Sequence, residues 1–238
     1  MRKQEAGELV SQRLGKHLGE ASQEIVTSQV PEDGCVHFGD QVVLEHPSSS
    51  SCVSTLPSPF PTTNPDIPVT GSPDAKPMRR TVFTLAPADP SKHKEGDPIR
   101  YGDRFRAYCT VPSHGTIYLM SEKQGLHNTP ARFSKFQNVF SRVVDEDEAA
   151  SSPMHDASWE FVYRDPNFRF ENEGEPVVAN EPVLLRHARS GICLCVLSKF
   201  LWRTEFGNQY EVAAHTHVNS HRVESDENVL VVRMGQES

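Results

Sequence analysis

A five-residue phrase that occurs three times is the feature that most restricts how this chain can fold. It reads VHFGD at residues 36–40, IRYGD at 99–103 and, more loosely, VVANE at 177–181. Its fourth residue is Gly39, Gly102 or Asn180, and these two residue types adopt positive φ at the least cost. Three and five positions further on, every copy is apolar: Val42 and Leu44, Phe105 and Ala107, Val183 and Leu185. Since side chains alternate between the faces of a strand, each copy predicts a tight turn and then a strand with one apolar face.

A second signature accompanies each copy, an aromatic-led segment that begins at Phe83, Trp159 or Tyr210. Three such units predict an all-β domain of the β-trefoil class, in which three four-stranded units share one core around a pseudo-threefold axis. A single unit cannot bury its own apolar face, so the repetition serves to complete that core. The alternative is a two-sheet sandwich in which the similarity of the three phrases is accidental.

Short alternating segments bounded by Gly, Pro, Asn and Asp fill most of the remaining chain and favour strands. Examples are QVVLEH at 41–46, RFRAYC at 104–109 and NVLVVRM at 228–234. The segment SKFLWRTEFG at 198–207 is ambiguous between helix and strand. The pattern therefore predicts one β domain over residues 31–238.

Residues 1–30 are expected to form a helical arm instead. Apolar residues such as Leu14, Leu18 and Ile25 recur at three- and four-residue steps and give a thin apolar stripe. Glycines within this stretch each weaken a helix by about 1 kcal/mol relative to alanine. We expect a helix that is stable only when docked, and the alternative is a frayed arm.

Residues 47–77 have a different composition, with eight prolines and seven serines in 31 residues. Segments with so little apolar surface rarely offset the entropy lost on ordering. The composition predicts a disordered or extended insertion outside the core. It further predicts that deleting residues 48–72 leaves the melting temperature nearly unchanged.

Composition excludes several classes of function. The net charge is −8 without a concentrated basic tract, which argues against a nucleic-acid partner. No apolar run approaches the ~18 residues of a membrane helix, so we expect a soluble intracellular protein. Cys193 and Cys195, two of five cysteines that include no CxxC pair, are interpreted as core-filling residues in a reducing compartment. Common catalytic and nucleotide-binding motifs are absent, which favours a protein without enzymatic activity or cofactor.

The string VAAHTHVNSHRVES is the most polar and distinctive part of the chain. It holds His215, His217, His221 and Arg222. His215 and His217 share one face of a strand, but no acidic partner is fixed at a telling distance, so a metal site is not favoured. We interpret the string as part of a partner interface. The alternative is that these side chains cap the closing turn of the domain.

Four strings together resemble the cilia- and flagella-associated protein 161 family. They are EDGCVHFGDQVVLEHP, IRYGDRF, ENEGEPVVANEPVLLRHARSG and EVAAHTHVNSHRVES. The resemblance covers most of residues 31–232 and skips the Pro/Ser-rich insertion. It implies a non-enzymatic microtubule inner protein of the axoneme, in the cytoskeleton of a cilium or flagellum. Such a protein lies in the A-tubule lumen of doublets, where it contacts tubulin and neighbouring luminal proteins and stabilises the doublets for beating. The repeats also resemble MIR-type β-trefoils.

A ligand-binding module is the second functional hypothesis. β-Trefoils often hold sugars or other small polar ligands between their units. The three repeats diverge outside their core positions, which speaks against a sugar site repeated in every unit.

Overall fold

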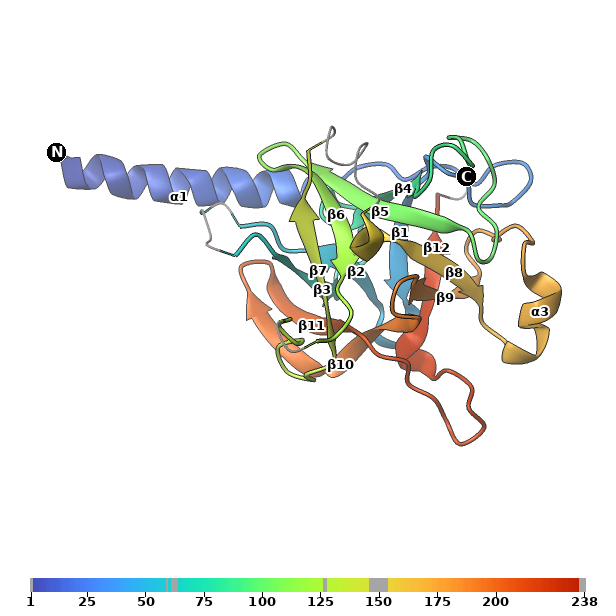
Figure 1. Ribbon diagram of the computed structural model, residues 1–238. Coiled ribbons are helices and arrows are strands. Elements are labelled where there is room, and N and C mark those ends of the chain that lie inside the picture. The colour runs from blue at the N-terminus through green and yellow to red at the C-terminus, as the bar shows by residue number, and fades with distance from the viewer. Residues whose placement is uncertain (1, 59, 61–63, 126–127, 146–153, 236–238) are drawn as a thin grey trace.

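The computed structural model describes residues 2–58, 60, 64–125, 128–145 and 154–235, and the side chains of the first helix from Val10 onward. A helix, α1 (Arg2–Ala21), projects from a body built almost entirely of strands (Figure 1). A short helix, α3 (Arg169–Asn172), and 3-10 turns lie in the connections. The all-β prediction for the body is confirmed. Among the described residues, no helix combines the length and the apolar character needed to span a membrane.

Six of the described strands form a closed antiparallel ring. They are β1 (Gln41–His46), β4 (Val82–Pro87), β5 (Arg104–Val111), β8 (Trp159–Tyr163), β9 (Pro182–His187) and β12 (Val229–Arg233). Each strand pairs with the next in this order, and β12 pairs with β1 to close the ring. The interior of the ring is the main core.

Three hairpins cover one end of this ring. They are β2 (Ser51–Thr55) with β3 (Ile67–Ser72), β6 (Gly115–Ser121) with β7 (Gln137–Val143), and β10 (Ile192–Thr204) with β11 (Gly207–Ala214). β3 pairs with β7, β7 with β11, and β11 with β3, so the hairpins meet in a triangle. We call this layer the hairpin cap.

The three repeated phrases meet at the other end of the ring. Val36 N–H donates to Val177 O, Val177 N–H to Ile99 O, and Ile99 N–H to Val36 O, each at 2.8 Å. The turn residues Gly39, Gly102 and Asn180 have φ of 97°, 91° and 62°. The positive φ predicted from the residue types is therefore confirmed, and the phrases serve to join three units.

The repeat predicts nine core residues: Val42, Leu44, Phe105, Ala107, Val183, Leu185 and the aromatic residues Phe83, Trp159 and Tyr210. They converge as predicted, but Tyr210 does not occupy the position in its unit that Phe83 and Trp159 occupy in theirs. Eight of them, all except Tyr210, belong to the main buried cluster, and Tyr210 packs against it half-buried. Tyr210 lies in hairpin strand β11, whereas Phe83 and Trp159 lie in ring strands. The turn amides of Gly39, Gly102 and Asn180 donate to Leu85, Phe161 and Val232, which makes Leu230 the true counterpart of Phe83 and Trp159. The third aromatic assignment was therefore wrong.

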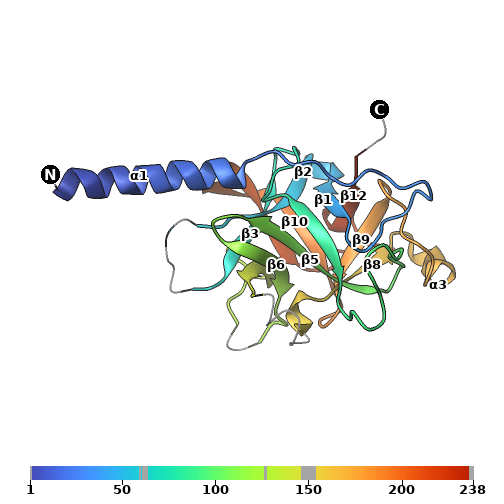
Figure 2. The ribbon, with the colours of Figure 1, turned by 90° about the horizontal axis from the view of Figure 1, so that it is seen from above.

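Helix α1 ends at Ala21 instead of continuing to residue 30, and it projects from the body in both views (Figures 1 and 2). Among its side chains from Val10 onward, those of the last turns dock: His17 and Ala21 are buried, and His17 Nε2 pairs with Pro57 O at 2.8 Å. After Ala21 the backbone bonds to the body instead, for example Ser28 N–H to Gln41 O at 2.8 Å. These bonds keep residues 22–30 extended, which the apolar spacing did not indicate.

The prediction of an unstructured insertion at residues 47–77 is wrong. Strands β2 and β3 lie within it, and Val53 and Val69 join the main core. Its polar side chains are buried with partners: Arg80 donates to Ser54 Oγ at 2.5 Å and to Ser72 Oγ at 3.1 Å. Residues 59 and 61–63 lie outside the described residues. Composition misled because small hydroxyl side chains can be buried when they are hydrogen-bonded.

Replacing Leu185 by alanine tests the shared core. Leu185 is fully buried between units, so L185A should lower the free energy of unfolding by about 2–5 kcal/mol in urea titration. The matched control is Leu201→Ala, since Leu201 is 60% exposed and its loss should change stability by less than about 0.5 kcal/mol. Equal effects from the two substitutions would contradict the assigned core.

Deleting residues 48–72 tests the corrected role of the Pro/Ser-rich segment. The deletion removes all of β2 and β3, including two core valines and one corner of the hairpin cap. The expected result is loss of the cooperative thermal transition in circular dichroism. A shortened chain that melts like the intact protein would restore the interpretation as a dispensable insertion.

Candidate functional site

The predicted interface segment, His215 to Glu224, follows β11 and forms a loop that protrudes from the body (the orange-red loop at the bottom of Figure 1). An isolated antiparallel bridge joins Val218 and Glu224 and closes the outer part of the loop. The chain then passes through the 3-10 turn Asp226–Asn228 into β12. The loop therefore has an inner part on the body and an outer tip.

Asn228 anchors the inner part. Its side chain is fully buried, and its Oδ1 accepts a hydrogen bond from His217 N–H at 2.7 Å. Its Nδ2 donates to Leu194 O at 2.9 Å and to His215 O at 2.8 Å. One amide side chain thus satisfies three backbone groups on two segments, and it fixes the position at which the loop leaves the body of the protein.

The His215 and His217 rings pack against Phe136 instead of extending into solvent. The His215 ring stacks on Phe136 with centroids 3.9 Å apart and an interplanar angle of 7°. The His217 ring meets His215 edge to face at 4.6 Å. Partial burial lowers the pKa of His215, with a smaller effect from His217, and burial likewise lowers the pKa of His217. Both imidazoles are therefore mainly neutral near pH 7.

His221 and Arg222 occupy the exposed tip. Asn219 Oδ1 accepts hydrogen bonds from the amides of His221 at 2.9 Å and Val223 at 3.1 Å. Arg222 has φ of 62°, a left-handed conformation that completes the turn. At the base of the tip, the Arg169 guanidinium on α3 pairs with Glu224 at 2.7 Å.

The structure thus divides the four residues predicted as one interface. His215 and His217 lie together on Phe136, while His221 and Arg222 lie at the tip. The alternative interpretation was that residues 215–222 cap the closing turn of the domain. It agrees with the backbone around His217, which is hydrogen-bonded to the Asn228 side chain just before β12. In the part of the chain that the structure describes, no group of three or more His, Cys, Asp or Glu side chains is arranged to hold a metal ion.

The cysteines near this loop are packed as expected. Cys193 lies among Val162, Leu184 and Val229, and Cys195 belongs to a separate small buried cluster. Burial raises the pKa of the Cys195 thiol to about 12, so the thiol is protonated at neutral pH. Their role as small buried apolar side chains is confirmed.

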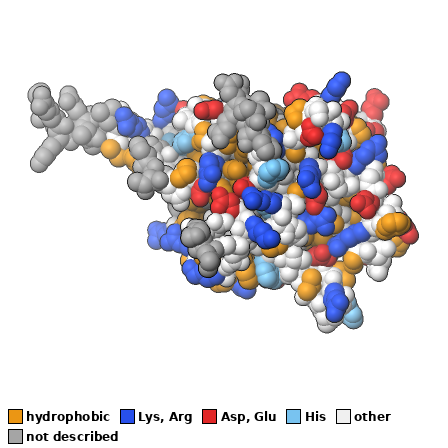
Figure 3. All heavy atoms as spheres, viewed as in Figure 1, with side chains coloured by type: hydrophobic (Ala, Val, Ile, Leu, Met, Phe, Trp, Pro, Cys, Tyr) orange, Lys and Arg blue, Asp and Glu red, His pale blue; other side chains and the backbone are white. Residues whose placement is uncertain are grey.

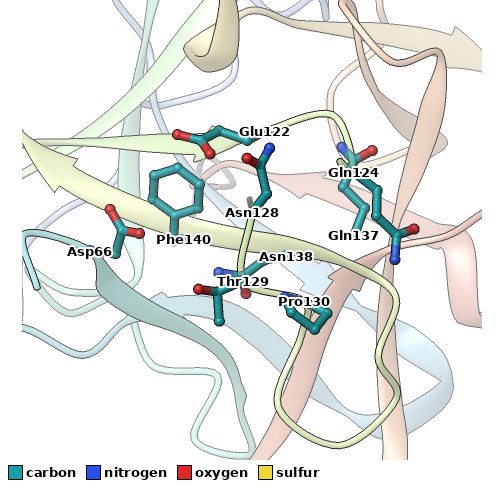
Figure 4. Close-up of a pocket in the computed structure, with 9 residues that line it drawn as sticks. All are labelled: Asp66, Glu122, Gln124, Asn128, Thr129, Pro130, Gln137, Asn138 and Phe140. Atoms are coloured by element: carbon teal, nitrogen blue, oxygen red, sulfur yellow. The ribbon is translucent and has the colours of Figure 1, made fainter. Parts of the chain in front are cut away.

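A second surface feature was not identified from the sequence. It is a groove of about 520 Å³ on the hairpin cap, which we call the Arg132 groove. Its lining includes Asp66, Arg132, Lys135, Trp202 and Glu211. A narrower pocket of about 20 Å³, room for one water molecule, adjoins it and shares Asp66 and Phe140 with it (Figure 4). The part of the sequence that could have indicated the groove is the segment 198–207, which contains Trp202 and whose pattern is ambiguous between helix and strand.

Asn228→Ala tests whether the inner part of the loop is structural. The substitution leaves buried backbone groups without partners, each worth about 1–3 kcal/mol, so unfolding should require clearly less urea. Asn219→Ala is the control, because solvent can replace the hydrogen bonds of its exposed side chain and the expected loss is below about 1 kcal/mol. The anchoring role is refuted if N228A is as stable as N219A.

Comparison with known proteins gives consistent results. Residues 60–235 match the model of the cilia- and flagella-associated protein 161-like domain. The chain is 32% identical to cilia- and flagella-associated protein 161 of Danio rerio over 240 residues, which cover 93% of this chain and 76% of the relative. It is 30% identical to the protein of the same name from Bos taurus, over 95% of this chain and 72% of the relative.

Solved structures with lower sequence identity share the fold. The SDF2-like protein from Arabidopsis thaliana gives a TM-score of 0.62 at 18% identity and covers 86% of this chain and 99% of its own. A Caenorhabditis elegans protein of unknown function gives 0.63 at 19% identity, with coverages of 85% and 98%. These likenesses concern the fold alone. The family match spans most of the chain, including β3, the other two hairpins of the cap and the loop after β11, and the chain therefore belongs to the cilia- and flagella-associated protein 161 family.

Proposed function

We propose that this protein is a non-enzymatic structural component of the axoneme that binds inside the A-tubule of ciliary doublet microtubules. Its partners there are tubulin and neighbouring microtubule inner proteins, and its role is to stabilise doublets for motility. Membership of a cilia- and flagella-associated family supports a place in the cilium or flagellum. The luminal position and the partners are the proposal.

The scaffold of this proposal is a β-trefoil of the MIR type. Three consecutive four-stranded units, β1–β4, β5–β8 and β9–β12, each give two strands to the ring and one hairpin to the cap. The cyclic bonds among Val36, Ile99 and Val177 support a pseudo-threefold axis through the ring. A compact scaffold of this kind presents loops in several directions at once.

The arm is the observation that carries the structural proposal. Helix α1 has 20 residues, so at 1.5 Å per residue it is about 30 Å long, and among its described side chains those that are buried, His17 and Ala21, belong to the last turns. Val10, on the projecting part, is 49% exposed. The three glycines of the helix each weaken it by about 1 kcal/mol relative to alanine, and most helical stability in proteins comes from packing, so a projecting arm favours a partner that holds it. An arm and a body that bind separate sites on a repeating lattice gain from high effective concentration.

The net charge of −8 restricts how such a protein meets acidic surfaces. Overall attraction is unfavourable, so local cationic groups and shape must supply the contacts. The loop tip offers one such group, because the Arg222 guanidinium is exposed and can pair with a carboxylate through two parallel hydrogen bonds.

A ligand-binding module is the second candidate. The narrow pocket in Figure 4 is too small for a sugar, whereas the Arg132 groove falls within the usual 300–1,000 Å³ of ligand sites. Binding to a glycan array would favour this function. Co-sedimentation with doublets would favour the structural one.

Changing the loop tip tests the proposed interface. The variant His221→Ser with Arg222→Asn removes the exposed side chains, and asparagine tolerates the left-handed backbone at position 222. We expect lower recovery of the variant in purified doublets from ciliated cells, while the melting temperature of the isolated protein changes by less than about 2 °C. His217 is left intact because its backbone is part of the fold.

The control for this experiment is Lys94→Gln, a charge change on the exposed loop between β4 and β5. It should enter doublets as the unmodified protein does. If the tip variant is also recovered normally, the tip is not an interface. If even the unmodified protein fails to co-sediment with doublets, the proposed function itself is wrong.

A further inference from the structure

The Arg132 groove lies where three parts of the hairpin cap meet. One wall comes from β3 and the segment before it, with Asp66 and Val69, and another from Asn138 to Phe140 of β7. The loop at 129–135 and Trp202 of β10 complete it. Because β3 is paired with β2, β7 and β11, it offers no free edge to which a strand could be added. Recognition in this groove must therefore use side chains.

Glu211 of β11 holds the loop that carries Arg132. Its carboxylate is almost fully buried, Oε1 accepts from Phe133 N–H at 2.6 Å, and Oε2 accepts from Ser134 N–H at 2.8 Å. Lys135 reinforces the turn, with φ of 63° and a bond from Nζ to Arg132 O at 2.8 Å. The loop is thus preorganised, and binding there costs little additional order.

The groove lining holds two carboxylates and two cations, but only the cations are exposed and available to a ligand. Both lining carboxylates are satisfied within the chain, since Glu211 caps two amides and Asp66 pairs with the Arg142 guanidinium at 2.6 Å. Arg132 and Lys135 are exposed, and neither forms an ion pair with a carboxylate of the described residues. The charged groups that the groove offers to a ligand are therefore cationic, in a chain of net charge −8.

Two further cations lie on β10, outside the lining of the groove. Lys199 and Arg203 are both exposed on that strand. Lys and Arg side chains gather over the β10–β11 end of the molecule in Figure 3 (lower left). Lys199 and Arg203 outnumber the exposed Glu205 in the turn of the same hairpin, which favours an approaching anion at this end of the cap.

Aromatic rings orient the arginine. The Arg132 guanidinium lies over the Trp202 ring at 4.8 Å from its centroid and over Phe133 at 5.5 Å. Phe133 in turn stacks on Phe200 at 6.0 Å. A guanidinium held on aromatic faces keeps its outer N–H groups free for a carboxylate, and the rings offer apolar surface beside it.

We propose that the Arg132 groove binds an extended acidic segment of a partner protein. A carboxylate of the segment pairs with Arg132 and Lys135, and an adjacent apolar side chain packs against Trp202. A protein segment fits better than a nucleic acid, because the cations are few and mixed with apolar surface, and the net charge of the chain repels a polyphosphate. The proposal concerns a different surface from the loop tip and does not depend on where in the cell the protein acts.

Trp202 provides the signal for a direct test. The chain has two tryptophans, and the other, Trp159, is fully buried with its Nε1 bonded to Leu119 O. Intrinsic fluorescence of the full chain is titrated with a short synthetic peptide of alternating glutamate and leucine. The expected result is a saturable change, at least about tenfold weaker with a peptide in which glutamine replaces glutamate. Trp202→Phe should abolish the change, which assigns it to the groove.

Charge variants distinguish specific binding in the groove from a general effect of net charge on peptide binding. Arg132→Gln with Lys135→Gln should weaken binding of the glutamate peptide at least about tenfold. The melting temperature should fall by no more than a few degrees, because both side chains are exposed and Glu211 still holds the backbone of the loop. Lys92→Gln with Lys94→Gln removes the same charge from the loop between β4 and β5 and should bind as the unmodified protein does.

Three outcomes would overturn the proposal. The first is equal weakening by the groove variant and the control variant. The second is equal binding of the glutamate and glutamine peptides. The third is a short single-stranded oligonucleotide that displaces the peptide and binds more tightly.

Discussion

The cyclic set of hydrogen bonds among Val36, Ile99 and Val177 is the constraint on which the rest of the structure depends. Each residue is fully buried, and each amide donates to the carbonyl of the next unit at 2.8 Å. Buried backbone groups must find partners, and here every partner comes from another unit. Each unit bonds its own turn amide, at Gly39, Gly102 or Asn180, but the amides of Val36, Ile99 and Val177 find partners only when all three units assemble, and the shared core follows from that assembly.

The loops that carry the candidate binding residues lie at or beside the hairpin cap, outside the closed ring. Two buried polar side chains beside β11 hold these loops in place: Glu211 binds the amides of the Arg132 loop, and Asn228 binds the base of the histidine-bearing loop. Glu211 and Asn228 are both buried, and each bonds to the backbone of the loop that it holds and leaves the exposed side chains of that loop unbonded to it. The exposed side chains on those loops are therefore presented by a rigid frame, as an interaction protein requires.

The Pro/Ser-rich segment shows how such a scaffold absorbs an unfavourable composition. Val53 and Val69 join the main core from its two strands, Ile67 packs against that core, and the hydroxyl groups of Ser54 and Ser72 are buried against Arg80. Arg80 itself lies under the Phe206 ring, with its guanidinium 4.6 Å from the ring centroid. Hydrogen bonds and pairing with β7 and β11 thus order a segment that would not fold alone.

Local patterns in the sequence determined the turns, the alternating strands and the core positions, because φ preference and strand alternation act within a few residues. They identified Gly39, Gly102 and Asn180 and the apolar residues after them, and they placed Cys193 and Cys195 in packed positions. Contacts between distant segments decided the rest. The counterpart of Phe83 and Trp159 is Leu230, which pairing partners reveal and aromatic spacing does not. The separation of His217 from Arg222 depends on Asn228, and the Arg132 groove unites Asp66, Arg132 and Trp202. These arrangements form only when the hairpins pack together, because a short stretch of sequence does not determine which distant loops will share a surface.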